Sequence, residues 1–189
     1  MANLKLISAT NTDSPVDVDS FKGHIGYSTS DVSRDEEFQL LLEAATEEAQ
    51  RFTGMQFMPV VYEMHNEDFT EAVELDIYPV TGVTEVKYFD ASNEENILVS
   101  GTDYFVDVVA DPAEVNFITT YTPYQYRNDA VVVTFGAGYT NASKVPPMIK
   151  AAIMLAAASL YVNPSDAVRT LPTISRNLLR QYRRHYNAD

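Results

Sequence analysis

The first third of the chain carries its apolar residues at the three- and four-residue spacings of amphipathic α-helices. Asp17 is placed to cap a short helix that puts Val18, Phe21 and Ile25 on one face. A second apolar stripe follows at the same spacings and consists of Phe38, Leu41, Leu42, Ala45, Ala49 and Phe52. The segment therefore predicts two helices, of which the second is the longer.

Sequence signals for both ends of the second helix flank this stripe. Ser33-Arg34-Asp35-Glu36 matches the capping box, in which the serine hydroxyl accepts a backbone N–H bond and the glutamate reaches back to the cap. Gly54 suits the position just after a helix, where the backbone turns to a positive φ. The sequence predicts a helix over residues 35–53.

Between Phe57 and Tyr139 the pattern changes to the period of two that is typical of β-strands. Apolar and polar residues alternate, as in Val83-Thr84-Glu85-Val86-Lys87-Tyr88, and prolines and glycines interrupt the alternation. The predicted strands are residues 60–65, 73–77, 83–89, 104–109, 114–117 and 130–135. Short strands with frequent turns predict an antiparallel module and argue against a βαβ sheet.

The last part of the chain returns to helical spacing. Pro146-Pro147 opens a helix that is apolar nearly all round as far as Val162, so we expect it to pack on several sides. Its apolar stretch is shorter than the ~20 residues that a bilayer span needs, and we expect no membrane association. A final helix from about Thr173 places Ile174, Leu178, Tyr182 and His185 on one face and Arg176, Arg180, Arg183 and Arg184 on the other.

These segments predict an α+β fold in which N- and C-terminal helices form a helical bundle with an inserted antiparallel β-rich module. The expected boundaries are an N-terminal helical part at 1–56, the β-rich insertion at 57–140, and C-terminal helices with a basic tail at 141–189. The first and third parts should form one helical domain, because each carries an apolar face too large to leave in water.

Composition and charge narrow the classes of function. The 189 residues contain no cysteine, which excludes disulfide scaffolds, thiol catalysis and thiolate zinc sites. The net charge of −14 argues against a protein that grips nucleic acid or anionic lipid by bulk charge. Residues 169–189 nevertheless carry five arginines and one aspartate, a local +4, which leaves −18 on residues 1–168. This asymmetry suggests a separate partner for the tail; the alternative is an arginine-rich solvated helix face.

Sites for catalysis are mostly absent from the sequence. The three histidines lie in separate predicted regions without metal-ligand spacing: His24, His65 and His185. The glycines at 136 and 138 lack the spacing and the lysine of a phosphate loop. Four acidic residues leave a carboxylate hydrolase or a calcium site open, although solvated acidic loops are the commoner explanation: Asp103, Asp107, Asp111 and Glu114. We expect no metal, no cofactor and no enzymatic activity.

The tyrosines offer a further candidate surface. Tyr121, Tyr124 and Tyr126 cluster around Pro123. Tyrosine buries area while keeping a polar tip, so this cluster suits an exposed contact loop. The alternative is that these residues belong to the core and the ordinary turns of the β-module, and both interpretations stay open.

Several apolar motifs with turns follow one another in a set order over most of the chain. They are the helix around Phe21, Lys22, His24 and Ile25; Arg51-Phe52-Thr53-Gly54; Leu75 to Val83 leading into Val86-Lys87-Tyr88; Tyr104 to Asp107; Val131 to Tyr139; Val145 to Ile153; Leu160-Tyr161; and Leu171-Pro172 through Leu178 to Arg183. In this order and spacing the chain resembles the head–tail connector proteins of tailed phages and the related gene transfer agents, also called adaptor or head-completion proteins.

The resemblance implies a virion structural protein of the neck, assembled in the host cytoplasm as a homo-oligomeric, dodecameric ring under the portal. Such a ring extends the DNA channel and docks the stopper or tail proteins, and DNA passes through it without specific binding. The resemblance also implies that the C-terminal region reaches toward the portal. The candidate contacts there are Arg169, Arg176, Arg180, Tyr182, Arg183, Arg184 and Tyr186. The alternative function is a small β-module that binds carbohydrate or peptide through the tyrosine loop.

Overall fold

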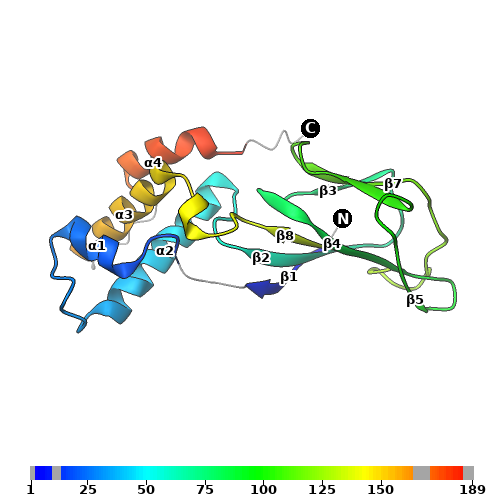
Figure 1. Cartoon of the computed structure of the whole chain (residues 1–189), viewed down its shortest axis with the longest axis horizontal. Helices are drawn as coiled ribbons and strands as arrows, with labels where there is room; N and C mark the ends of the chain where they lie inside the picture. The colour runs from blue at the N-terminus through cyan, green and yellow to red at the C-terminus, as the bar shows by residue number, and fades with distance from the viewer. Residues whose placement is uncertain (1–2, 10–13, 164–170, 185–189) are drawn as a thin grey trace. The chain divides into compact units, whose positions relative to one another are not determined.

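A computed structural model describes residues 3–9, 14–163 and 171–184. The chain divides into a β unit (Met1–Asn11 and Pro59–Gly138) and a helical unit (Thr12–Met58 and Tyr139–Asp189). The elements, labelled in Figure 1, are β1 (Asn3–Ala9), α1 (Val18–Ile25), α2 (Asp35–Thr53), β2 (Val60–Asn66), β3 (Ala72–Leu75), β4 (Val80–Phe89), β5 (Glu95–Ile97), β6 (Tyr104–Asp107), β7 (Ala113–Phe117), β8 (Val131–Ala137), the 3-10 helix η1 (Ala142–Lys144), α3 (Pro147–Val162), α4 (Thr173–Leu179) and the 3-10 helix η2 (Arg180–Tyr182). The expected α+β class is confirmed.

The β unit consists of two antiparallel sheets. The larger has the strand order β1-β2-β8-β4-β5, and the smaller has the order β3-β7-β6. β8 lies at the centre of the larger sheet, which explains its nearly continuous apolar sequence. Gly136 of β8 approaches β4 closely, because a Cβ there would lie 2.5 Å from the Oγ1 atom of Thr81. The buried core of the unit consists of Val60, Met64, Val73, Leu75, Val86, Leu98, Tyr104, Ala113, Val115, Val133, Phe135 and Ala137.

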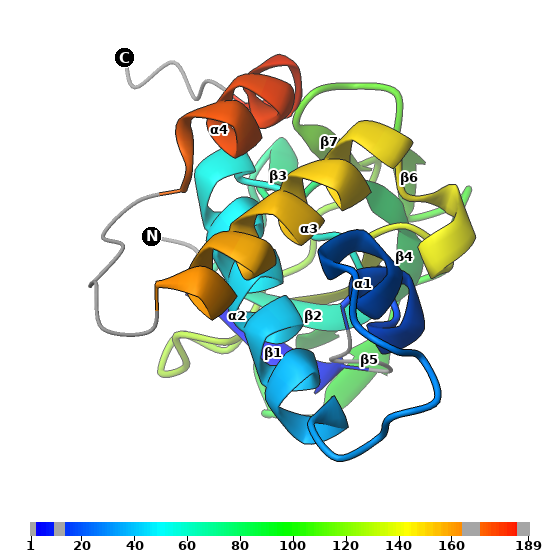
Figure 2. The same ribbon diagram turned by 90° about the vertical axis from the view of Figure 1, so that its left-hand side faces the viewer.

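In the helical unit, α3 packs on α2, α4 packs on both, and α1 packs against α2 and α3 (Figure 2). Phe38 of α2 lies at the centre, with its ring edge-on to Phe21 at 5.7 Å, Tyr27 at 5.1 Å and Tyr161 at 5.7 Å. The small residues of α3 let the two long helices approach, since Ala152, Ala156 and Ala157 are among its buried residues. The expected packing of N- and C-terminal helices on one another is confirmed.

A buried lysine joins α1 to α2. The side chain of Lys22 is fully buried, and its Nζ atom forms ion pairs with Asp35, at the first turn of α2, and with Asp19 at 3.7 Å. The hydrogen bond to Asp35 raises the pKa of Lys22 above its ordinary value. Lys22 therefore stays charged, and the ion pairs fix α1 on the start of α2.

The predicted N-terminal boundary, which places residues 1–56 in the helical part, is wrong. Residues 3–9 form β1, which pairs with β2 from Asn3↔His65 to Ala9↔Val60. The alternation of Leu4-Lys5-Leu6 is typical of a strand. However, this strand forms by pairing with a distant segment, and the local sequence does not show which segment that is. The three residues of β5 were not among the predicted strands either.

The predicted capping box at Ser33 is also wrong. Arg34 is the N-cap residue of α2, and no side chain caps the helix. The Ser33 N–H instead donates to Asp31 at 3.0 Å, so the serine belongs to the preceding turn. Arg34 bonds Glu37 through two contacts of 2.7 Å and the Tyr161 hydroxyl at 3.0 Å, which ties the start of α2 to α3.

The final helix is shorter than expected and its buried face differs. α4 ends at Leu179 and tightens into η2, so the helical spacing assumed across residues 173–185 does not continue. Leu171, Ser175 and Leu179 are buried at intervals of four, whereas Ile174 is 63% exposed. His185 lies outside the described residues. The predicted strand 104–109 likewise ends early, because Asp107 Oδ1 accepts the N–H groups of Val109 and Ala110 and turns the chain.

The turn before α2 makes the helical unit sensitive to acid. Hydrogen bonds from the Ser33 side chain and N–H and from the Tyr27 hydroxyl lower the pKa of Asp31 to about 2. Because the folded pKa lies below the unfolded one, this contribution to stability is present above about pH 4 and is lost as the pH falls toward 2. We expect the urea midpoint of the helical unit to fall over this range, and to fall less in Asp31→Asn. If the urea midpoint fell equally with pH in the wild-type protein and in Asp31→Asn, the acid sensitivity would not come from Asp31.

Candidate functional site

The basic tail contributes both buried and exposed side chains. Arg180 and Arg183 are exposed, Arg176 is half-buried, and Tyr182 packs partly against the core of the helical unit. Within the described residues, Arg176, Arg180 and Arg183 form no ion pair. Among the described residues, three cationic groups of an acidic chain thus have no anionic partner. Arg169 and Tyr186, the other candidates here, lie outside the described residues.

The tail is also anchored to its own helical unit. The Arg184 N–H donates to the Thr53 carbonyl oxygen at 2.9 Å, which satisfies one of the free carbonyl groups at the end of α2. The Arg183 guanidinium lies 5.4 Å from the centre of the Phe52 ring, and the Gln181 amide donates to the Met148 sulfur at 2.8 Å. These contacts position the arginines on the bundle, so that Arg180 projects from an ordered turn.

Tyr121 of the tyrosine loop packs in an aromatic cluster of the β unit, although 36% of it stays exposed. Its ring stacks on Tyr88 at 4.9 Å and lies 6.1 Å from Phe69, which in turn contacts Phe117 at 4.9 Å. Its hydroxyl donates to Asp103 at 2.8 Å. Tyr121 therefore orders the loop.

The rest of the loop is held so that Tyr126 projects into solvent. The Tyr124 N–H donates to the Phe89 carbonyl oxygen at 2.9 Å, and the Arg127 guanidinium lies 3.5 Å from the centre of the Phe89 ring while bonding Asp129 twice at 2.9 Å. Tyr126 lies edge-on to Tyr124 at 5.6 Å and remains 85% exposed. A fixed aromatic side chain in solvent suits a contact with another protein.

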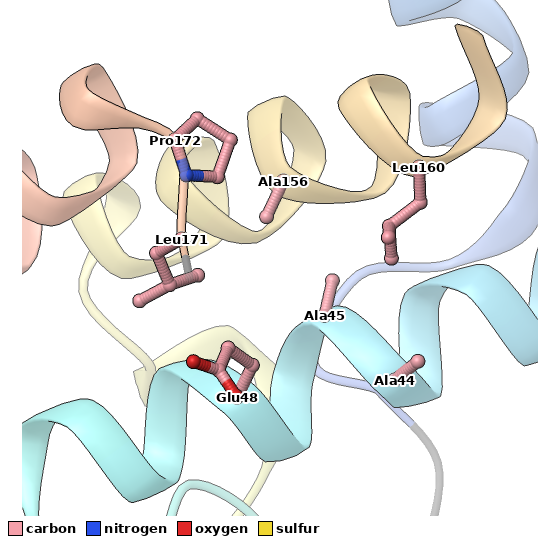
Figure 3. Close-up of a pocket in the computed structure, with 7 residues that line it drawn as sticks. All are labelled: Ala44, Ala45, Glu48, Ala156, Leu160, Leu171 and Pro172. Carbon is pink, nitrogen blue, oxygen red and sulfur yellow. The ribbon is translucent and has the colours of Figure 1, made fainter. Parts of the chain in front are cut away.

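A shallow apolar groove of about 160 Å³ opens on the helical unit. Figure 3 shows Leu160 of α3 directed toward α2, with Leu171 and Pro172 at the other end. The groove is lined by Ala44, Ala45, Glu48, Ala156, Leu160, Leu171 and Pro172. One carboxylate among apolar groups gives this groove no catalytic machinery.

The acidic residues of the β unit do not assemble a site. Asp103 accepts bonds from the Val99 N–H and the Tyr121 hydroxyl, and Asp107 caps the turn after β6. Glu114 lies opposite Asp107 on the neighbouring strand. In the part of the chain that the structure describes, no three His, Asp or Glu side chains gather as a metal would require. None of its helices is long and apolar enough to cross a membrane.

The structure exposes apolar side chains at two places that the sequence did not predict. Leu4 and Leu6 of β1 are largely exposed, and Val109, in the turn between β6 and β7, is 90% exposed. Alternation in Leu4-Lys5-Leu6 could have revealed the first. The second has no sequence signal, since a valine after a strand is ordinarily buried.

Comparison with known proteins gives structural matches only. No protein-family model matches the sequence, and no curated protein matches it either. A chain from the neck of an empty gene transfer agent particle, computed with C6 symmetry, superposes with a TM-score of 0.76 over 97% of this chain and 96% of that chain, at 20% identity. The chain shares its fold with a gene transfer agent neck protein.

Two further matches agree with the first. The neck of the native gene transfer agent particle, computed with C12 symmetry, gives a TM-score of 0.72 at 20% identity over 97% of this chain and 96% of the other. The virion of the native particle gives 0.75 at 20% identity over 96% and 95%. At this identity the likeness to the neck protein concerns the fold, and the fold expected from the resemblance in the sequence is confirmed.

Proposed function

We propose that this chain is a structural protein of a virion neck, a head–tail connector that assembles as a ring below the portal. The observation that carries the proposal is the likeness to the neck chain over nearly the whole length of both proteins, which includes the β unit and the helical unit together. A shared single module would be common among unrelated proteins, whereas two modules interleaved in the same order are not. The proposal assigns the chain no catalytic role.

The ring is proposed to contain twelve copies. The matching chains come from necks computed with C6 and with C12 symmetry, and a closed ring of identical chains is compatible with both. Tail or stopper proteins would dock on the exposed surfaces, for which Tyr126 is the best placed of the three candidate tyrosines.

Solution mass and negative-stain images of the purified chain, alone and mixed with portal-bearing heads, test this function. We expect a ring, either free or on the portal. A chain that stays monomeric and leaves the portal bare would contradict the proposal. If that monomer instead bound a glycan or a peptide through the tyrosine loop, the β-module alternative would replace it.

DNA is expected to pass through the ring without being retained. The net charge of −14 leaves no counterion release to drive association, and residues 1–168 alone carry −18. In a gel-shift assay at ~150 mM salt we expect no retained complex with duplex DNA. A retained complex would contradict the proposal that DNA passes through the ring without binding to it.

The portal-facing surface is proposed to be the basic tail. Arg180 and Arg183 are exposed and have no ion pair among the residues described, and arginine is a frequent interface anchor. An acidic surface on the portal would complete their pairing. The proposed contact extends on either side of these two arginines and also includes Arg169, Arg176, Tyr182, Arg184 and Tyr186.

A further inference from the structure

The apolar groove of the helical unit has room for a side chain from another polypeptide. Its walls are α2, α3 and the residues that lead into α4 (Figure 3), and Ala44, Ala45 and Ala156 are among its lining residues. These short side chains leave about 160 Å³ open. An apolar cavity of ~150 Å³ holds a group as large as benzene, so an aliphatic side chain fits here.

An arginine lies next to this groove. Arg176 is one helical turn beyond Pro172 on the same face of α4, since its N–H donates to the Pro172 carbonyl oxygen at 2.9 Å. Among the residues that the structure describes, Arg176 forms no ion pair, and its buried Nε atom has no hydrogen-bond partner. Glu48, the acid of the groove, is already paired with Arg51. The site therefore favours an occupant that carries an apolar side chain and a carboxylate together.

Three loops of the described chain place an exposed valine next to an aspartate: Val32 with Asp31, Val99 with Asp103, and Val109 with Asp107. The carboxylates of Asp31 and Asp103 are fully used, because each accepts a hydrogen bond on both of its oxygen atoms. Asp107 accepts the N–H groups of Val109 and Ala110 on Oδ1 alone. Its Oδ2 atom has no partner within the described residues and can accept a bond from an arginine.

Val109 is also the most exposed of these three valines, at 90% against 70% for Val32 and 60% for Val99. The bonds of 2.8 and 3.1 Å that Asp107 Oδ1 accepts fix the turn of residues 107–111, so Val109 is held in solvent by an ordered backbone. A side chain on an ordered turn loses little conformational entropy when it binds. This turn presents the apolar side chain and the carboxylate that suit the groove and Arg176.

We propose that in the ring the turn of residues 107–111 of one copy docks in the apolar groove of the next copy, with Val109 in the groove and the Asp107 carboxylate against the Arg176 guanidinium. The inference rests on the proposed ring function. A closed ring needs a head-to-tail contact between two different surfaces of the same chain, and here the β unit supplies one and the helical unit the other. Arg176 is half-buried at the inner margin of the basic tail, which leaves the exposed Arg180 and Arg183 for the portal.

Because the chain contains no cysteine, disulfide cross-linking tests the contact directly. In the double variant Ala44→Cys/Val109→Cys, assembled on portal-bearing heads and mildly oxidised, we expect a ladder of disulfide-linked multimers on a non-reducing gel. A mixture of the two single variants should stop at dimers. The matched control is Ala44→Cys/Ala91→Cys, because Ala91 is exposed in the turn between β4 and β5. The expected yield of multimers is at least ~10-fold above this control, since docking holds the thiols within disulfide range.

A single substitution tests the apolar part of the contact. Val109→Glu should lower the amount of ring at least ~10-fold, because it would bury an unpaired carboxylate in the groove. It should leave the urea midpoint of the β unit unchanged, since Val109 makes little contact with its own protomer. Val99→Glu is the matched control and should assemble normally, because the N–H of Val99 likewise donates to an aspartate at 2.8 Å on an exposed loop.

The outcomes separate this contact from the proposed function. Rings without the disulfide ladder, or a monomer closed by an internal disulfide, would overturn the docking of the turn in the groove while the proposed function stands. Rings of Val109→Glu at wild-type levels, or equal losses for Val109→Glu and Val99→Glu, would do the same. A wild-type chain that forms no ring overturns both.

Discussion

Replacing Phe38 with alanine is expected to lower the free energy of unfolding of the helical unit by about 3–5 kcal/mol, the cost of removing a fully buried aromatic ring. Phe38 is 0% exposed and contacts aromatic rings from α1, from the loop after α1, and from α3. The Arg34 guanidinium also lies 5.6 Å from the centre of its ring. The substitution removes the residue on which three segments converge, so surrounding side chains cannot collapse into the space without moving helices.

Urea unfolding followed by circular dichroism at the helical wavelength measures this loss. Leu40→Ala is the matched control, because Leu40 lies on the same helix and is 65% exposed; its expected cost is below about 0.5 kcal/mol. A loss under 1 kcal/mol for Phe38→Ala, or equal losses for both variants, would contradict the central position of Phe38.

Reversing the charge of Arg180 is expected to weaken docking onto portal-bearing heads by about tenfold to thirtyfold, the effect of losing an interface arginine. Arg180 is exposed in η2, has no ion pair among the described residues, and is flanked by contacts that hold the segment in place. Glutamate there would meet the acidic surface that the proposal assigns to the portal. Binding of the labelled chain to purified heads at ~150 mM salt measures the change, at an ionic strength where distant charges are screened.

Lys144→Glu is the control for this reversal. Lys144 is exposed in η1, also a short 3-10 helix of the helical unit, and the charge change is the same. If Arg180→Glu and Lys144→Glu weakened docking onto the heads equally, docking would depend on the net charge of the chain and not on the basic tail. Truncation from Thr173 is a poorer test, because it also removes Leu179, which is fully buried in the core.

The sequence predicted the elements whose apolar pattern is local. The stripe from Phe38 to Phe52 identified α2, Gly54 marked its end, and the buried helix after Pro146 was predicted from its apolar sequence. The sequence did not predict β1, because β1 is stabilised by pairing with β2, and α1 and α2 separate these two strands in the sequence. Strand formation of that kind depends on a partner that no window of sequence contains.

The candidate surfaces were predicted less completely. A count of charges was enough to single out the arginines of the tail, but the apolar pattern did not show that α4 buries Ser175 and Leu179 and leaves Ile174 exposed. Clustering of tyrosines likewise pointed to the loop without separating Tyr121, which is tied to Asp103, from the exposed Tyr126. That distinction depends on contacts between strands.

The alternation of the chain between the two units has a consequence for biosynthesis. Residues 1–11 and 59–138 build one unit, and residues 12–58 and 139–189 build the other, so neither is a continuous stretch of polypeptide. During synthesis on the ribosome, β1 cannot pair with β2 until α1, α2 and β2 have emerged. The packing of α2 on α3 cannot form until most of the chain has been synthesised. Closing such distant contacts is slow compared with local ones. We therefore expect most native structure to form after release, during a period in which the half-covered strand of Leu4 and Leu6 is open to premature association.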